Sequence, residues 1–159
     1  MMKLGPRDMP GSIWDERGKT KLVQILVSYK YSGISSIQFA YVVHGAVRHS
    51  EIYGNPDGAE FDTVTLDYPS EFLVSVSGNY GTNVWNSKNQ LMWIAFTTNK
   101  CKYGPFGQKN GANKDSFSYR FGLRSCFAGF HGSVFESCVY AIGVYVKPID
   151  SLYELKDEE

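Results

Sequence analysis

Apolar and polar residues alternate with a period of two along most of the chain, and this pattern is typical of β-strands with one buried face. The alternating stretches are rich in β-branched and aromatic residues, and short segments containing glycine, serine or proline separate them. Strands are therefore predicted over residues 22–29, 34–43, 62–66, 72–78, 90–98, 115–120, 127–131 and 139–146. Helical periodicity is almost absent, and only the segment after Asp150 has a weak helical pattern. The sequence thus predicts an all-β fold.

A faint threefold repeat runs through this series of strands, and internal repeats indicate a repeated architecture. The three units share an apolar pattern, although the last has its aromatic residue offset by one position. They are Ile34-x-x-Ile37-x-Phe39, Leu91-x-x-Ile94-x-Phe96 and Val139-x-x-Ile142-x-Tyr145. Each unit follows a β stretch that ends in a turn rich in glycine or serine. Three such units in one domain favour three sheets around a pseudo-threefold axis, while the alternative is that alternating strands look alike by chance.

The composition is that of one globular domain. A chain of 159 residues with 43% hydrophobic and 20% charged residues can bury a core of its own. Aromatic residues make up 15% and glycine occurs 16 times, which suits an all-β domain with many turns. The formal net charge is zero, but residues 150–159 carry five acidic side chains and one lysine, a local charge of −4. We therefore predict a domain over residues 1–149 and an acidic C-terminal tail over residues 150–159.

Several classes of partner and location are not favoured by the sequence. The positive charges of residues 1–149 are spread out rather than gathered in a stripe, so we expect no nucleic-acid partner. No apolar run approaches the roughly 18 residues of a membrane span, and the first residues lack the apolar region of a signal peptide, so we expect no membrane partner. The cysteines Cys101, Cys126 and Cys138 form no Cys-x-x-Cys pair, which favours reduced thiols in a cytoplasmic protein. A disulfide between Cys126 and Cys138 stays open as the alternative.

The sequence carries no arrangement typical of an enzyme. His44, His49 and His131 are not spaced like the ligands of a metal site. The chain has no glycine loop for phosphate and no nucleophile elbow. Cys138 has no evident base and is interpreted as a small apolar strand residue. We therefore expect no enzymatic activity, no catalytic residue, no metal site and no cofactor.

A set of short motifs occurs along the chain in a fixed order. The motifs are Trp14-Asp15-Glu16-Arg17-Gly18, Leu66-Asp67-Tyr68-Pro69-Ser70-Glu71, Ser75-Val76-Ser77-Gly78, Thr98-Asn99-Lys100, Tyr103-Gly104-Pro105-Phe106-Gly107, Gly129-Phe130-His131-Gly132 and Ile142-Gly143-Val144-Tyr145. In this order and spacing, the chain from about Gly5 to Pro148 resembles the jacalin-related lectins of plants. Its continuous N-terminal region is similar to their single-chain, mannose-preferring branch. The resemblance implies a β-prism of three four-stranded Greek-key sheets with pseudo-threefold symmetry.

The resemblance also implies a shallow sugar site at one end of the prism, built from two loops. Sugar hydroxyls are held well by a carboxylate that accepts two hydrogen bonds and by backbone N–H groups in a tight turn. The family supplies these through a Gly-x-x-x-Asp loop before the last strand and through an N-terminal glycine loop, which Gly11 matches. Counting back from Ile142, Glu136 stands where the family has glycine and Tyr140 where it has aspartate. The implied carbohydrate-binding residues are Gly11, Glu136, Ser137, Cys138, Val139 and Tyr140.

The missing aspartate puts ordinary sugar binding in question. A charge-assisted hydrogen bond is worth roughly 1.5–3 kcal/mol, so its loss should weaken binding of a monosaccharide about 10- to 150-fold. Glu136 is a candidate substitute carboxylate, and the alternative is a solvated loop charge. Tyr140 is a candidate aromatic platform with a hydroxyl, and the alternative is a half-buried strand residue. The loop from Gly132 onward is also expected to be one residue longer than the common form of the family.

Two functional hypotheses follow from the resemblance. The first is a lectin domain of a plant defence protein that binds mannose-type glycans, with sugar binding weakened or altered by the changed loop. The second is a β-prism that has lost sugar binding and acts in antiviral defence by binding a viral or cellular protein. The altered loop supports the second, because it is similar to that of members linked to virus resistance. Family members often form dimers, and a homo-oligomer would amplify a weak site.

Overall fold

The structure is a computed structural model that describes residues 1–82, 89–108, 112–122 and 126–148. Within these ranges the chain forms β-strands and no helix, so no described segment could cross a membrane as a helix. The strands are β1 (Met2–Leu4), β2 (Ser12–Asp15), β3 (Leu22–Lys30), β4 (Gly33–Val43), β5 (Ala46–His49), β6 (Tyr53–Gly54), β7 (Glu60–Thr65), β8 (Leu73–Thr82), β9 (Asn89–Thr98), β10 (Lys102–Gly107), β11 (Ala112–Arg120), β12 (Phe127–Phe135) and β13 (Cys138–Val146). The predicted acidic tail over residues 150–159 lies outside the described residues.

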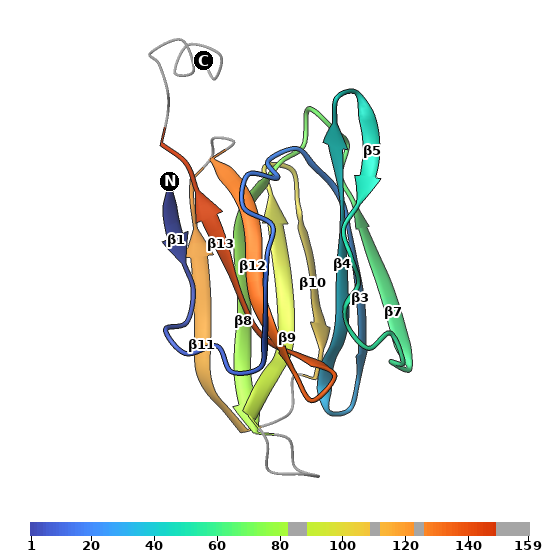
Figure 1. The fold of residues 1–159 in the computed structure, drawn as a ribbon, viewed down its shortest axis with the longest axis vertical. Coiled ribbons are helices and arrows are strands. Elements are labelled where there is room, and N and C mark those ends of the chain that lie inside the picture. The colour runs from blue at the N-terminus through green and yellow to red at the C-terminus, as the bar shows by residue number, and fades with distance from the viewer. Residues whose placement is uncertain (83–88, 109–111, 123–125, 149–159) are drawn as a thin grey trace.

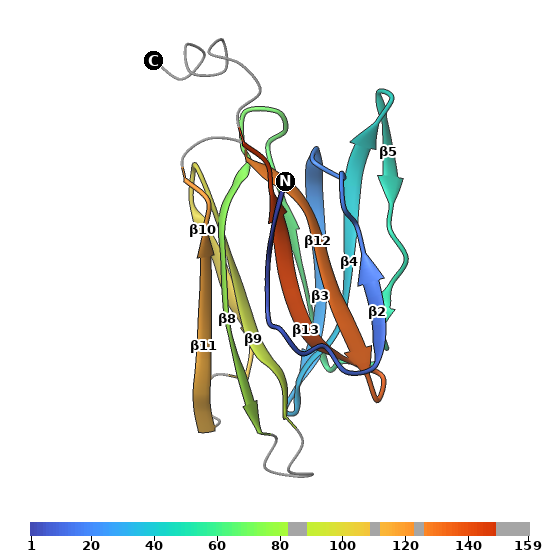
Figure 2. The ribbon, with the colours of Figure 1, turned by 60° about the vertical axis from the view of Figure 1, so that its left-hand side comes forward.

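The strands form three antiparallel sheets with the same spatial order, as Figures 1 and 2 show. One sheet has the order β10-β9-β8-β11, and another has the order β5-β4-β3-β7. In both, three consecutive strands lie side by side and a later strand returns beside the first, which is the Greek-key order. The remaining sheet, β1-β13-β12-β2, reaches the same order by joining the two ends of the chain. The predicted fold is confirmed, with one difference: β6 pairs with β4 and adds a fifth strand to the second sheet.

The three repeat units form the centre of the prism. They lie on β4, β9 and β13, which occupy equivalent second positions in their sheets and contact one another. Their shared apolar side chains are at most 1% exposed; these are Ile34, Ile37, Phe39, Leu91, Ile94, Phe96, Val139 and Ile142. The repeat in the sequence therefore reflects the burial of three equivalent strands against one axis.

The aromatic offset in the third repeat has a structural reason. Successive residues of a strand point to opposite faces, so Val144 rather than Tyr145 stands in register with Phe39 and Phe96. The missing ring comes from the neighbouring strand: Phe130 stacks on Phe39, with centroids 4.4 Å apart, and meets Phe96 edge-on at 6.3 Å. Offset and edge-on pairs of this kind add to the stability that burial provides. The repeat pattern therefore assigns the third aromatic residue of the core to the wrong strand.

His131 on β12 has a structural role, because it links β1 to the rest of the sheet β1-β13-β12-β2. Its side chain is buried, and its Nε2 donates a hydrogen bond to the carbonyl oxygen of Leu4 at 2.8 Å. The ring occupies space that two glycines leave, because a Cβ would lie 2.7 Å from it at Gly5 and 2.4 Å from it at Gly143. Burial lowers the pKa of His131 and so favours the neutral ring.

Candidate functional site

A two-residue turn joins β12 to β13 at the lower end of the prism in Figure 1. Its residues, Glu136 and Ser137, have φ angles of 51° and 67°, so both adopt the left-handed conformation that type I′ hairpin turns require. The prediction that the strand ends at His131 and a loop begins at Gly132 is therefore wrong, while the comparison of its length with the family's common form stays a prediction. Strand β12 extends as far as Phe135 because β13 pairs along one of its edges and β2 along the other.

This turn should be under backbone strain that a single substitution relieves. A left-handed residue other than glycine costs about 1–2 kcal/mol, whereas glycine avoids this cost but loses more freedom on folding. We expect Ser137→Gly to raise the free energy of unfolding by about 1 kcal/mol in a denaturant titration. A second turn in which two successive residues have positive φ, His44 and Gly45 between β4 and β5, provides the control. Gly45→Ser should lower stability by a similar amount, because φ is 77° there and no atom lies within 4 Å of a Cβ. A lower stability for Ser137→Gly would contradict the strain.

Tyr140, at the position of the family's aspartate, occupies a β-bulge. The β12–β13 pairing steps from Ser133 opposite Ala141 to Val134 opposite Val139, so Tyr140 is an extra residue without a partner on β12. A bulge changes the direction in which a side chain points. The half-buried ring of Tyr140 meets Phe135 edge-on, with centroids 5.9 Å apart.

Gly11 brings the N-terminal segment against this hairpin, as Figure 2 shows for the chain leading into β2. Its φ is 92°, and a Cβ there would lie 2.1 Å from the carbonyl oxygen of Val134 and 3.0 Å from Cβ of Phe135. Only glycine permits this approach. The structure therefore places two separately predicted parts of the site, Gly11 and the last hairpin, in contact. On the other side of the turn, the backbone N–H of Asn55 donates to the carbonyl oxygen of Ser137 at 2.9 Å.

Two stacked aromatic side chains pack beside the β12–β13 hairpin. Trp14 on β2 stacks on Tyr53 of β6, with ring centroids 4.2 Å apart and planes 10° apart. Gly132 leaves room for the indole, because a Cβ there would lie 2.6 Å from the Trp14 ring. Tyr53 donates its hydroxyl hydrogen bond to the Glu16 carboxylate, and its burial together with this bond raises the pKa of Tyr53. The Trp-Asp-Glu motif thus positions β2 against β6 and β12.

A groove of about 420 Å³ opens beside Tyr140. Its lining combines residues from the N-terminal segment and three strands, namely Pro6, Arg7, Asp8, Tyr80, Asp115, Tyr140 and Ala141. Tyr80 is fixed there because its hydroxyl lies 3.1 Å from both the backbone N and the backbone O of Ile142. Burial raises the pKa of Tyr80, so it stays protonated. Arg7, Asp8 and Asp115 are exposed at the groove, and sequence reasoning missed all three as site residues.

The predicted site residues differ in what they can offer a ligand. Tyr140 lines the groove, while Glu136 and Ser137 are exposed at the tip of the turn. Cys138 is half-buried, and the side chain of Val139 is fully buried in the core, so Val139 can take part only through its backbone. Carboxylates accept hydrogen bonds from hydroxyls and a guanidinium donates them. The groove, with two aromatic side chains, two carboxylates and one guanidinium, has the chemistry that a polyhydroxylated ligand needs.

The described residues show no feature of a metal site. No group of three His, Cys, Asp or Glu side chains within the described ranges could hold a metal ion. The disulfide considered between Cys126 and Cys138 is absent from the structure.

The family model described as Jacalin-like lectin domain matches residues 5–145 of the chain. The chain belongs to the jacalin-like lectin family. The match covers nearly the whole stretch over which the ordered motifs indicated this family, and it confirms that prediction.

Other members of the jacalin-like lectin family resemble the chain over most of its length. Protein RESTRICTED TEV MOVEMENT 1 of Arabidopsis thaliana is 36% identical over 154 residues, covering 92% of this chain and 87% of the relative. Jacalin-related lectin 2 of Arabidopsis thaliana is 32% identical over 141 residues, which cover 85% of this chain and 77% of the relative. The solved structure of artocarpin in complex with mannotriose has a TM-score of 0.78 at 28% identity, covering 92% of this chain and 97% of artocarpin.

Proposed function

We propose that this jacalin-like lectin domain binds mannose-type glycans through the groove beside Tyr140, without the family's aspartate. The observation that carries the proposal is that the bulge residue Tyr140 lines a groove that also holds the carboxylates of Asp8 and Asp115. Artocarpin, which has the same fold, forms complexes with mannotriose and with methyl-α-mannose. The scaffold is therefore suited to a mannose-type ligand, and two carboxylates near the altered position can accept hydrogen bonds from its hydroxyls.

Each part of the groove has a distinct role in this proposal. The ring of Tyr140 packs against an apolar face of the sugar, as aromatic side chains do with amphipathic ligands. Asp8 and Asp115 accept hydrogen bonds from sugar hydroxyls, and Arg7 donates to sugar oxygens. Gly11 keeps the N-terminal segment close enough to the hairpin for both walls to reach one ligand. Binding of this kind needs no catalytic group, so we propose a binding protein rather than an enzyme. We also propose a cytoplasmic location, which the free cysteines support.

A second function, binding of a protein in plant defence, is favoured by a different observation. Ile13 on β2 and Phe135 on β12 are 59% and 40% exposed, so these two paired strands present apolar side chains to solvent near the hairpin turn. Exposed apolar side chains of this size are suited to contact with a protein. A relative of similar length is named for restricting TEV movement. The partner would be a viral or cellular protein or a second copy of this chain.

Calorimetric titration of the full chain with mannotriose tests the first proposal. We expect saturable heat in the millimolar range, and we expect Asp8→Asn and Asp115→Asn each to weaken binding about tenfold or more, since each removes a charge-assisted hydrogen bond. Asp67→Asn, at an exposed carboxylate after β7 that does not line the groove, is the matched control and should bind as the native chain does.

Two outcomes would count against glycan binding at this groove. Absence of saturable heat with the native chain would favour protein binding as the role of the altered hairpin. Saturable heat that persists unchanged in Asp8→Asn and Asp115→Asn would place the sugar elsewhere on the molecule.

A further inference from the structure

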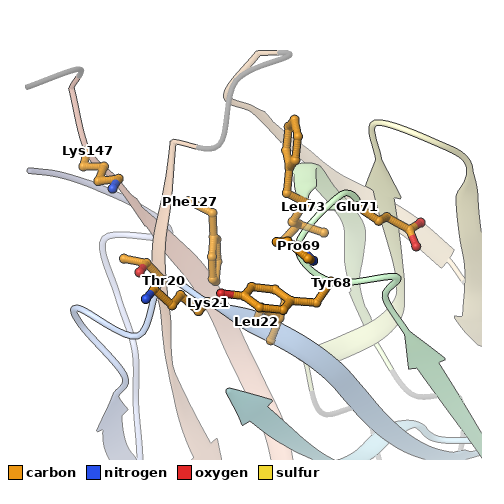
Figure 3. Close-up of a pocket in the computed structure, with 10 residues that line it drawn as sticks. Thr20, Lys21, Leu22, Tyr68, Pro69, Glu71, Leu73, Phe127 and Lys147 are labelled. Carbon is orange, nitrogen blue, oxygen red and sulfur yellow. The ribbon is translucent and has the colours of Figure 1, made fainter. Parts of the chain in front are cut away.

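A second pocket lies at the opposite end of the prism from the hairpin turn, and Figure 3 shows it in close-up. It has a volume of about 250 Å³ and lies between the start of β3, the start of β12 and the segment over residues 66–72. The glycan groove uses none of its residues. We propose that this pocket binds a small carboxylic acid whose body is a single aromatic ring.

The walls of the pocket are suited to an aromatic body. Leu22 and Leu73 form buried apolar surface, and Phe127 adds a ring that is 2% exposed. Tyr68 lies across the pocket in Figure 3 with its hydroxyl directed towards Lys21 and Phe127, and its side chain is 37% exposed. A flat ring can pack between such surfaces, because aromatic rings prefer offset-stacked or edge-on contacts.

The charge at the pocket selects an anion. Lys21 and Lys147 both line it, and neither forms an ion pair with another described residue. The carboxylate of Glu71 is also nearby, but Figure 3 shows it directed away from the pocket. It instead accepts hydrogen bonds from Thr98 Oγ1 at 2.6 Å and from the Tyr103 hydroxyl at 2.8 Å. The two ammonium groups thus attract a carboxylate without competition from inside the pocket.

The wall that carries Tyr68 is held in place by hydrogen bonds to the segment that follows β9. The Asn99 side chain accepts from the backbone N–H of Phe72 and donates to the carbonyl oxygen of Ser70, both at 2.9 Å. Lys100 Nζ lies 3.0 Å from the Asp67 carboxylate and 2.9 Å from Ser70 Oγ. Binding of a ligand therefore does not require this segment to become ordered, which favours binding by a small molecule.

The size of the pocket limits the ligand. Drug-sized ligands occupy pockets of about 300–1,000 Å³, and this pocket of about 250 Å³ suits a smaller molecule. A free aromatic acid and a peptide that ends in phenylalanine carry the same combination of ring and carboxylate. Titration with each of them distinguishes the two sources.

An NMR titration of the full ¹⁵N-labelled chain with phenylacetate tests the proposal. We expect saturable amide shifts at Leu22, Tyr68 and Phe127, with a Kd of about 1–10 mM, as the size of the ligand allows. Phenylacetamide, which is neutral, should bind with an affinity at least about tenfold lower than that of phenylacetate. The double variant Lys21→Gln, Lys147→Gln should lose about tenfold in affinity for phenylacetate, because both cations are removed.

A matched lysine variant and a peptide ligand complete the experiment. Lys30→Gln, which removes a lysine paired with Asp57 elsewhere on the surface, should bind phenylacetate normally. A short peptide ending in phenylalanine identifies a peptide source if it shifts the same residues more strongly than phenylacetate, and a small-acid source if it does not. Equal binding of phenylacetamide, unchanged affinity in the double lysine variant, or shifts confined to other residues would each overturn the proposal.

Discussion

Replacing Glu71 by alanine should lower the free energy of unfolding by about 3–5 kcal/mol, the cost typical of removing one partner of a buried charged network. The side chain is 4% exposed, and its carboxylate accepts three hydrogen bonds from nitrogen and oxygen donors, besides a longer one of 3.9 Å from the Cys101 thiol. They come from Thr98 Oγ1 at 2.6 Å, the Tyr103 hydroxyl at 2.8 Å and the backbone N–H of Asp67 at 2.9 Å. In the variant the buried Thr98 hydroxyl and the partly buried donors of Tyr103 and Asp67 lose this acceptor. Denaturant titration measures the loss.

The pH dependence of Glu71→Gln provides the matched control. Burial raises the pKa of Glu71, but the hydrogen bonds from Thr98, Asp67 and Tyr103 and the charge of Lys100 together outweigh it, so the pKa lies below its ordinary 4.5. A carboxyl with a lowered pKa contributes stability that is present above its unfolded pKa and lost as pH falls through the folded one. The native chain should therefore exceed Glu71→Gln in stability at neutral pH, and the difference should shrink well below pH 4.5. A difference that stays constant would contradict this account of the network.

Gly11→Ala should have the second largest effect and should reduce glycan binding as well. The φ of 92° alone costs alanine about 1–2 kcal/mol, and the Cβ would meet the Val134 carbonyl oxygen at 2.1 Å. Overpacking of this kind adds about 1–3 kcal/mol. We expect a total loss of about 2–5 kcal/mol in the free energy of unfolding, and we expect weaker binding of mannotriose, because the N-terminal segment must move away from the hairpin.

Gly18→Ala separates the two contributions. Its φ is 90°, nearly that of Gly11, but no atom lies within 4 Å of a Cβ there. This variant should lose only about 1–2 kcal/mol and should bind mannotriose normally. Equal losses in the two variants would show that the contact between Gly11 and β12 does not matter.

The sequence predicted the long central strands better than the short and edge strands. The pattern of apolar residues revealed β3, β4 and β9, because each supplies several fully buried side chains to the core. It missed β10, which contains Gly104 and Pro105. In the structure β10 is an edge strand, and its pairing with β9 shifts register between Tyr103 and Phe106. Edge strands tolerate proline and glycine at such irregularities, so their composition does not reveal them.

The candidate site was predictable only in part. The family motif located Gly11 and Tyr140, and the structure brings their surroundings together. The shape of the hairpin was not predictable, because Glu136 and Ser137 are not the asparagine and glycine that usually mark a type I′ turn. The charged groove residues were not predictable either. Asp8 and Asp115 are far apart in the sequence, and exposed charges leave no periodic signal.

An NMR titration of the ¹⁵N-labelled chain with mannotriose tests the proposed glycan site most directly, because it reports both binding and position. We predict saturable amide shifts at Asp8, Gly11, Asp115 and Tyr140, all beside the β12–β13 hairpin. The absence of saturable shifts at millimolar mannotriose, or shifts confined to the opposite end of the prism around Tyr68, would contradict the account.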